Sequence, residues 1–411
     1  MNSTVKNLVA RVTHGRRDVV ETLMFASFFV VSTRMWYVEE HVVFLSMLFA
    51  LAFGSLASGM TLIPRLDPSL RTLPILLLVA VGAIMLLSSL WSPEPHRTFS
   101  YAVFSVLQIF IGISFARIIK IESLLSGVFL GALGVGLYSL TISFARGLNP
   151  LDGELLLGLF TNQSDLSFIL GLGVAAAIPF LGKQVSATLL FGPGALLLLV
   201  YLWHLSYLTT AVTLTAVSVV VVGLIIVRST EVETRIKVSL GLAALAAAVV
   251  IALWFFRAPI QVALGKTPDF SGRVPFWLRF WGDIQEQPFL GVSWGFTRDE
   301  LGGTGQIVPH QEIFPAHNGF IEIAFALGIP AAILLATALA VAFVVGFVSA
   351  SKANASWLAA GVPLLVTYLL VHDLAGSWLP RVLGLFMMAS IFSYLAIKQQ
   401  ERESTPPSVV T

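Results

Sequence analysis

An arginine and a histidine in the second half of the chain are the side chains best suited to chemistry. Arg273 follows Ser271 and precedes Pro275. This pattern is typical of a helix start, because serine caps helices and proline fits the first turn. A guanidinium beside the free N–H groups of a helix N-terminus is suited to bind a phosphate group. The residue types therefore predict an anion site at Arg273, although an arginine here also suits lipid headgroups.

His317 lies directly before a long apolar segment, and Asn318 follows it. An imidazole placed where water meets a bilayer suits a general base, which contributes about 10²–10⁴-fold in rate. Asn318 is suited to orient a substrate, and Glu322, one helical turn further on, is expected to fix the helix start. The alternative is that His317 and Asn318 are only polar caps of a helix.

Ionisable residues inside apolar segments are expensive and indicate functional sites by default. Asp165 lies close to Asn162 and Gln163, and the three could break a helix and line a cavity. His372 and Asp373 lie at the end of another segment, where they form either a proton relay or a helix cap. No His, Asp and Glu residues in the long polar loop have metal-site spacing, so no metal or cofactor is predicted.

An apolar composition determines the elements that position these residues. Of the 411 residues 57% are hydrophobic and 11% are charged, and the mean hydropathy is +0.89. Apolar runs of about twenty residues predict transmembrane helices and exclude a membrane barrel, whose strands are about ten residues long. The chain has no cysteine, which excludes disulfides and thiol nucleophiles, and its net charge is only +2. No nucleic-acid partner is predicted, whereas contact with membrane lipid is.

These runs predict an all-α polytopic membrane protein with about twelve transmembrane helices. The predicted helices are 19–33, 42–63, 73–91, 98–116, 123–145, 158–181, 186–203, 208–227, 238–256, 317–349, 356–371 and 382–397. The long loop between helices 9 and 10 is polar but rich in aromatic residues, which disordered segments lack. Phe276, Trp277, Phe280 and Trp281 have i,i+4 spacing and predict an apolar stripe on a helix at the membrane interface.

The distribution of basic residues predicts the orientation of the chain. Most of the 24 lysines and arginines fall near the two chain ends and in every second connection between the predicted helices. Connections with such an excess of basic residues face the cytoplasm. Both termini are therefore expected in the cytoplasm and the long loop outside. The predicted organisation is transmembrane helices 1–9 in 1–256, a periplasmic loop with an interfacial helix in 257–316, helices 10–12 in 317–398, and a disordered cytoplasmic tail in 399–411.

The order of several motifs resembles the bacterial O-antigen ligase and polysaccharide polymerase superfamily. These are Ser271-Gly272-Arg273 with Trp277, Pro288 to Val292, and His317 to Glu322 with Gly328. The ligase signature is a histidine, then Asn, Ser or Gln, nine residues, a glycine, two residues, and Gly, Thr or Tyr. His317, Asn318 and Gly328 fit this signature, and Ala331 does not. Trp91-Ser92 and Gly158-Leu159-Phe160 are weaker matches, and the family's twelve helices and long periplasmic loop match the predicted architecture.

The resemblance implies a metal-independent, inverting glycosyltransferase of the bacterial inner membrane with a periplasmic active site. The donor would be a glycan on undecaprenyl diphosphate. The acceptor would be lipid A–core for a ligase of lipopolysaccharide biosynthesis, or a growing lipid-linked glycan for a polymerase. Arg273 would hold the departing diphosphate, and His317 would take the proton of the acceptor hydroxyl. A solute transporter is the alternative of another class, to which Asp165 gives slight support.

Two positions depart from the family pattern. Many relatives carry Ser-Arg or Ser-Lys near the start of the eighth span, where this chain has Leu208 to Ala211, and Ser164 stands where the sixth span often has asparagine. A second phosphate-binding cation would therefore come from elsewhere in the chain. The residues assigned to substrate binding are Arg146, Arg279, Arg298, Asn318 and Trp277.

Overall fold

The apolar runs of the sequence become long helices in the computed structural model. The structure describes residues 18–27, 29–30, 71–148, 156–158, 160, 163–181, 185–205, 208–228, 273–295, 316–352, 355–374, 376 and 382–403. Within these ranges every regular element is helical, so the predicted all-α class is confirmed for that part of the chain.

Most described helices match the predicted ranges to within a few residues. The helices that correspond to predicted spans are α3 (Leu73–Leu87), α4 (Pro95–Ile118), α5 (Ile121–Ala145), α6 (Gln163–Leu181), α7 (Val185–Leu205), α8 (Leu208–Arg228), α14 (Ile329–Ala350), α15 (Gly361–Asp373) and α16 (Val382–Glu403). Further elements are α11 (Arg273–Glu286), α13 (Gly319–Leu327) and the 3₁₀ helices η3 (Ser88–Leu90) and η5 (Trp357–Ala360). Predicted helices 42–63 and 238–256 lie outside the described residues.

The length and composition of these helices are those of a multi-pass membrane protein. Among the described residues, five helical stretches are long and apolar enough to cross a membrane, and they correspond to α3 with η3, α4, α5, α6 and α14. Shorter apolar stretches lie in α7, α8, α15 and α16. The predicted total of about twelve spans includes segments beyond the part of the chain that the structure describes.

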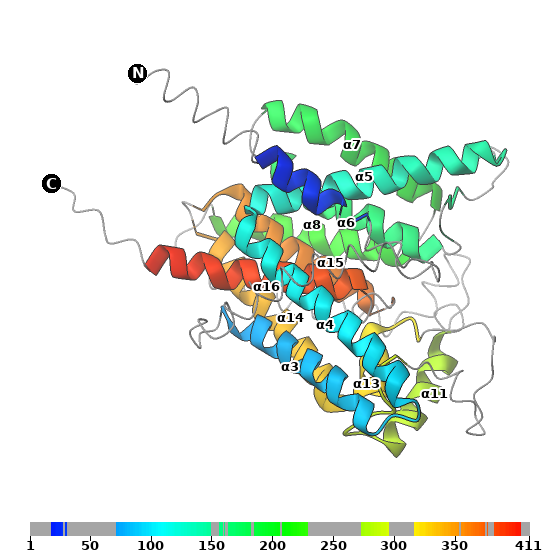
Figure 1. Ribbon diagram of the computed structural model, residues 1–411. Coiled ribbons are helices and arrows are strands. Elements are labelled where there is room, and N and C mark those ends of the chain that lie inside the picture. Colours follow the sequence, from blue (N-terminus) through cyan, green and yellow to red (C-terminus); the bar gives the residue numbers. More distant parts are fainter. Residues whose placement is uncertain are drawn as a thin grey trace.

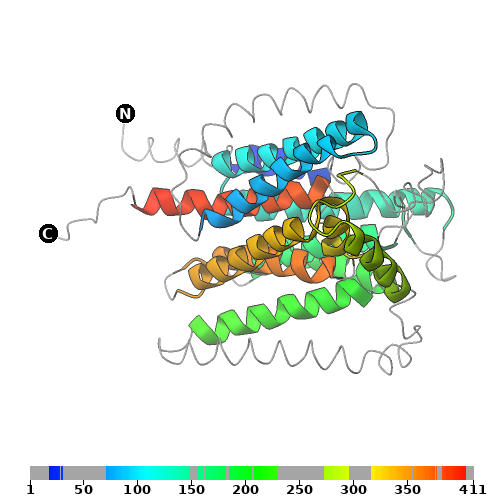
Figure 2. The ribbon, with the colours of Figure 1, turned by 90° about the horizontal axis from the view of Figure 1, so that it is seen from below.

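The long helices run side by side, and their ends gather at two ends of the bundle (Figures 1 and 2). Consecutive helices with short connections pack together, as α3 does with α4 and α14 with α15. α11 and α13 lie at one end of the bundle, and the C-terminal end of α16 lies at the opposite end (Figure 1). Arg228, the last residue of α8, donates a hydrogen bond from Nε to the Ala350 carbonyl at the end of α14. The C-terminal ends of these two helices therefore lie together, and the basic-residue pattern predicts that they face the cytoplasm.

α6 is the most buried long helix among the described elements, and it contacts α5, α7, α8 and α15. Gly171 permits close packing, because a Cβ atom here would lie 2.3 Å from Tyr368 Oη and 2.7 Å from Thr210 Cγ2. Tyr368 Oη donates a hydrogen bond to the Phe168 carbonyl at 2.9 Å. α6 therefore forms the centre of the bundle. It begins at Gln163, later than predicted, and Gly158 has a positive φ of 59° outside it.

The prediction of one helix over 317–349 is wrong, because two helices occupy this range. α13 ends at Leu327, Gly328 has a φ of 86°, and α14 begins at Ile329. This φ is outside the helical region and favours glycine. The break keeps α13 at the end of the bundle, where it packs against α11.

Candidate active site

α11 presents one face to α13 and leaves the other face exposed. Phe280 and Ile284 are buried in a small cluster, and Trp277 packs against it; the cluster also contains Ala316, Ala324 and Phe325. Phe276 and Trp281 are exposed. The predicted helix start is confirmed, since α11 begins at Arg273. The four aromatic residues of the predicted stripe lie on one side of this helix. Trp277 and Phe280, at the centre of the stripe, pack against α13, whereas Phe276 and Trp281, at its edges, are exposed.

The contacts between α11 and α13 follow the same order along both helices. Trp277 Nε1 donates a hydrogen bond to the Ala316 carbonyl at 2.7 Å, and the rings of Phe280 and Phe325 meet edge to face at 5.1 Å. The N-terminal ends of the two helices therefore lie together. Arg273, partly buried, is one turn before Trp277 and lies on the same side of α11.

The turn that follows α11 fills the break between α13 and α14. The Ile329 N–H donates to the Pro288 carbonyl at 2.8 Å, and the Val292 N–H donates to the Phe325 carbonyl at 2.9 Å. A Cβ atom on Gly328 would lie 2.2 Å from the carbonyl oxygen of Phe289. The motif Pro288 to Val292 thus packs against Gly328, the glycine that ends α13.

Replacing Gly328 with alanine is expected to destabilise the protein strongly. The positive φ alone costs about 1–3 kcal/mol for a residue with a side chain, and the clash with Phe289 adds to that cost. The thermal midpoint of the purified protein measures the effect. Gly282→Ala on α11 is the matched control, because no atom lies within 4 Å of its Cβ position and alanine favours a helix by about 1 kcal/mol over glycine. Equal midpoints for Gly328→Ala and the wild type would contradict the packing described for this turn.

The residues after the turn dock onto the connection between α3 and α4. Trp294 is buried, its Nε1 donates to Ser105 Oγ at 2.9 Å, and its backbone N–H donates to Ser88 Oγ at 3.1 Å. Sequence reasoning missed this contact, because isolated serines on apolar helices give no periodic signal. The contact holds the segment that follows α11 against η3 and α4.

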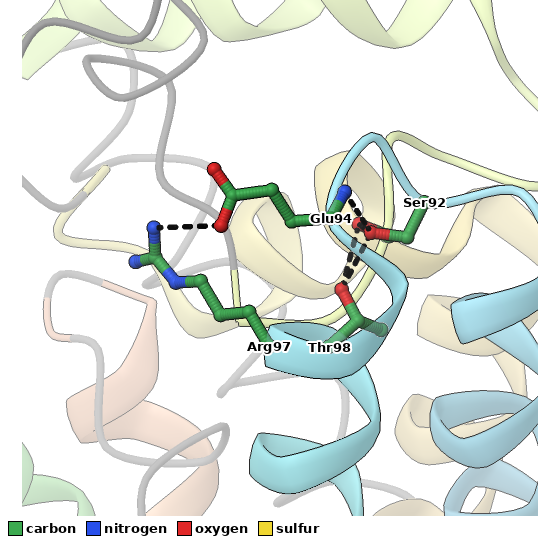
Figure 3. A network of polar contacts seen from close by, with 5 residues as sticks. Ser92, Glu94, Arg97 and Thr98 are labelled. Atoms are coloured by element: carbon green, nitrogen blue, oxygen red, sulfur yellow. Dashed lines mark hydrogen bonds and ion pairs between the residues drawn. The ribbon is translucent and has the colours of Figure 1, made fainter.

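Hydroxyl groups continue the contact toward the surface. Ser293 Oγ donates to Ser92 Oγ at 3.1 Å, and Ser92 and Thr98 share a hydrogen bond of 2.7 Å. Figure 3 shows Ser92 and Thr98 facing each other and Arg97 turned toward Glu94, which it meets at 4.0 Å. The hydroxyls bond one another, so Ser92 of the Trp91-Ser92 motif is part of this docking contact.

His317 has a left-handed backbone conformation with a φ of 51°, which is uncommon for residues other than glycine. Such strained residues occur preferentially at functional sites and need surroundings that hold them. Ala316, the preceding residue, is fully buried, and its carbonyl accepts the hydrogen bond of Trp277. His317 itself is partly exposed. His317 therefore has a fixed backbone at a partly exposed position.

Asn318 caps α13 with its side chain. Its Oδ1 accepts hydrogen bonds from the N–H groups of Phe320 and Ile321, both at 3.1 Å, and its Nδ2 donates to the Leu374 carbonyl at 3.0 Å. The capping role, predicted as the alternative to substrate binding, is confirmed. The second contact joins the start of α13 to the end of α15.

Similarity to known proteins indicates the family that this chain resembles. Residues 170–336, which extend from α6 into α14 and include α11 and the turn, match the O-antigen ligase family. The predicted O-antigen ligase-like resemblance is confirmed. The exopolysaccharide production protein ExoQ of Rhizobium meliloti (strain 1021) is 25% identical to this chain over 265 residues. That alignment covers 62% of this chain and 61% of the relative.

The other arginines predicted to bind substrate have varied surroundings. Arg279 is exposed on α11. Arg146 follows α5, and its Nη1 donates to the Gly158 carbonyl at 3.0 Å. Arg298 lies outside the described residues. Arg146 is therefore hydrogen-bonded to Gly158, the first residue of the Gly158-Leu159-Phe160 motif.

Asp165, His372 and Asp373 are all buried. Asp165 lies in the first turn of α6 rather than at a break within it. His372 and Asp373 end α15 and are fully buried, and the His372 ring meets Phe168 edge to face at 4.9 Å. In the ranges that the structure describes, no three His, Asp or Glu side chains gather as a metal ion would require.

Proposed function

We propose that the protein is a membrane glycan transferase that moves a glycan from undecaprenyl diphosphate to an acceptor hydroxyl at the periplasmic face of the inner membrane. In this proposal the acceptor is lipid A–core, as for an O-antigen ligase, and the reaction needs no metal. The family match over residues 170–336 and the set of apolar helices support it.

The contact between Trp277 and Ala316 is the observation that carries the proposal. Arg273 lies one turn before Trp277 on the same side of α11, and His317 directly follows Ala316. A cationic group and a proton acceptor are thereby expected to face one substrate. This pairing suits a reaction in which the acceptor hydroxyl loses a proton while the departing diphosphate gains negative charge.

In the proposed reaction, His317 takes the proton of the acceptor hydroxyl as its oxygen attacks the anomeric carbon. The new glycosidic bond forms on the side opposite the diphosphate, so the anomeric configuration inverts. The sugar–phosphate bond breaks, and its electron pair leaves with undecaprenyl diphosphate, whose charge Arg273 stabilises. The proton then passes from His317 to water. The exposed apolar side chains of α11, including Leu278 and Trp281, suit a helix that lies at the membrane interface.

A polymerase is the second candidate, because the similar protein ExoQ is named for exopolysaccharide production. The donor and the two roles would be the same, and the acceptor would be another lipid-linked glycan. The two candidates differ in the molecule that supplies the hydroxyl.

Expression in an O-antigen-producing bacterium that lacks its own ligase tests the two candidates. A ligase is expected to restore a ladder of glycan attached to lipid A–core on a lipopolysaccharide gel. In a strain that lacks the polymerase but keeps its own ligase, a restored ladder of long chains on lipid A–core would support the second candidate. Purified protein that transfers glycan without an ion gradient would exclude a pure transporter. Folded protein with none of these activities would contradict the proposed function.

A further inference from the structure

We infer that Trp277 and Asn318 are positioning residues that hold His317 in its working conformation, rather than contacts for the glycan. The inference rests on the proposed role of His317 as the base. It replaces the sequence-based assignment of both residues to substrate binding.

Trp277 acts on the peptide plane that precedes His317. The Ala316 carbonyl and the His317 N–H belong to one planar peptide group. A hydrogen bond of 2.7 Å from Trp277 Nε1 to that carbonyl therefore fixes the plane from which the His317 φ is measured. An indole has a single N–H donor and no acceptor, so this bond uses the polar atom that would otherwise bind a sugar hydroxyl.

Asn318 holds the other side of His317. Its Oδ1 accepts two backbone N–H groups of α13, and its Nδ2 donates to Leu374 at the end of α15. Both ends of the amide are thus engaged with the protein. His317 lies between one residue fixed by α11 and another fixed by α13 and α15. A φ of 51° is unfavourable for histidine, and contacts on both sides explain how the conformation is maintained.

Two conservative substitutions separate positioning from substrate binding. Trp277→Phe keeps an aromatic ring and removes the N–H, and Asn318→Asp keeps a capping oxygen and removes the Nδ2 donor. Each variant is expected to lower kcat by roughly 10- to 100-fold with an unchanged KM, because small misplacements of a catalytic group cost rates of this order. Trp281→Phe on the exposed face of the same helix is the matched control and is expected to keep wild-type kinetics.

The assay uses purified protein, undecaprenyl-diphosphate-linked glycan extracted from a ligase-deficient O-antigen producer, and lipid A–core from the same strain. The rate at which diethyl pyrocarbonate modifies His317, followed by mass spectrometry, is measured on the same samples. Trp277→Phe is expected to change this rate, and Trp281→Phe is not. A raised KM at constant kcat, or wild-type behaviour of both variants in both assays, would overturn the inference. Changed His317 reactivity without transfer by the wild type would leave the positioning intact and contradict the proposed function.

Discussion

Replacing His317 with asparagine is expected to lower the transfer rate by about 10²–10⁴-fold, the contribution typical of a general base. Asparagine tolerates a positive φ better than most residues, so the variant keeps the backbone at a φ of 51° while it loses the imidazole. The amide of asparagine does not accept a proton near neutral pH. The loss should therefore appear in kcat, with a normal yield of folded protein.

Transfer of glycan to lipid A–core by the purified variant measures the effect, normalised to the folded fraction from size-exclusion chromatography. His96→Asn is the matched control, because His96 is an exposed histidine in the first turn of α4. It is expected to retain wild-type activity. Wild-type activity in His317→Asn would remove this residue from the mechanism.

The positions of the helices could be predicted from sequence because each depends on a local property. Runs of apolar residues with the length of a bilayer crossing predicted α3, α4, α5, α7 and α8 to within a few residues. The start of α11 at Arg273 was equally local, since Ser271 and Pro275 surround it. The helix cap at Asn318 could also be predicted from local sequence, because a cap involves only the next turn of the chain.

The break at Gly328 could not be derived from hydrophobicity, because α13 and α14 are both apolar. It depends on a turn some forty residues earlier, whose backbone bonds to Phe325 and Ile329. A local signal was present nonetheless, because a glycine such as Gly328 two residues before a proline such as Pro330 is typical of a helix end and a new helix start. The hydrogen bond from Trp277 to the Ala316 carbonyl has no comparable sequence signal. Every residue has a backbone carbonyl, so this bond does not restrict the type of residue at position 316.

Replacing Arg273 with lysine is expected to lower kcat and raise the KM for the lipid-linked donor, although the charge is kept. A guanidinium offers two parallel N–H donors to a phosphate, whereas an ammonium is a compact point charge. Loss of one charged hydrogen bond corresponds to about 1.5–3 kcal/mol, or roughly 10- to 150-fold in kcat/KM. The KM for the acceptor should stay unchanged, because in the proposed mechanism Arg273 contacts only the diphosphate.

The KM values for the donor and for the acceptor together distinguish this role from that of an arginine that only contacts lipid headgroups. An arginine held by lipid headgroups would tolerate lysine, which extends to headgroups equally well. Arg117→Lys, at the C-terminal end of α4 far from α11, is the matched control and should keep wild-type kinetics. Arg273→Ala should be worse than Arg273→Lys, since it removes the charge as well as the fork. If Arg273→Lys and the control behave alike, Arg273 has no part in holding the donor, and another cation must stabilise the departing diphosphate.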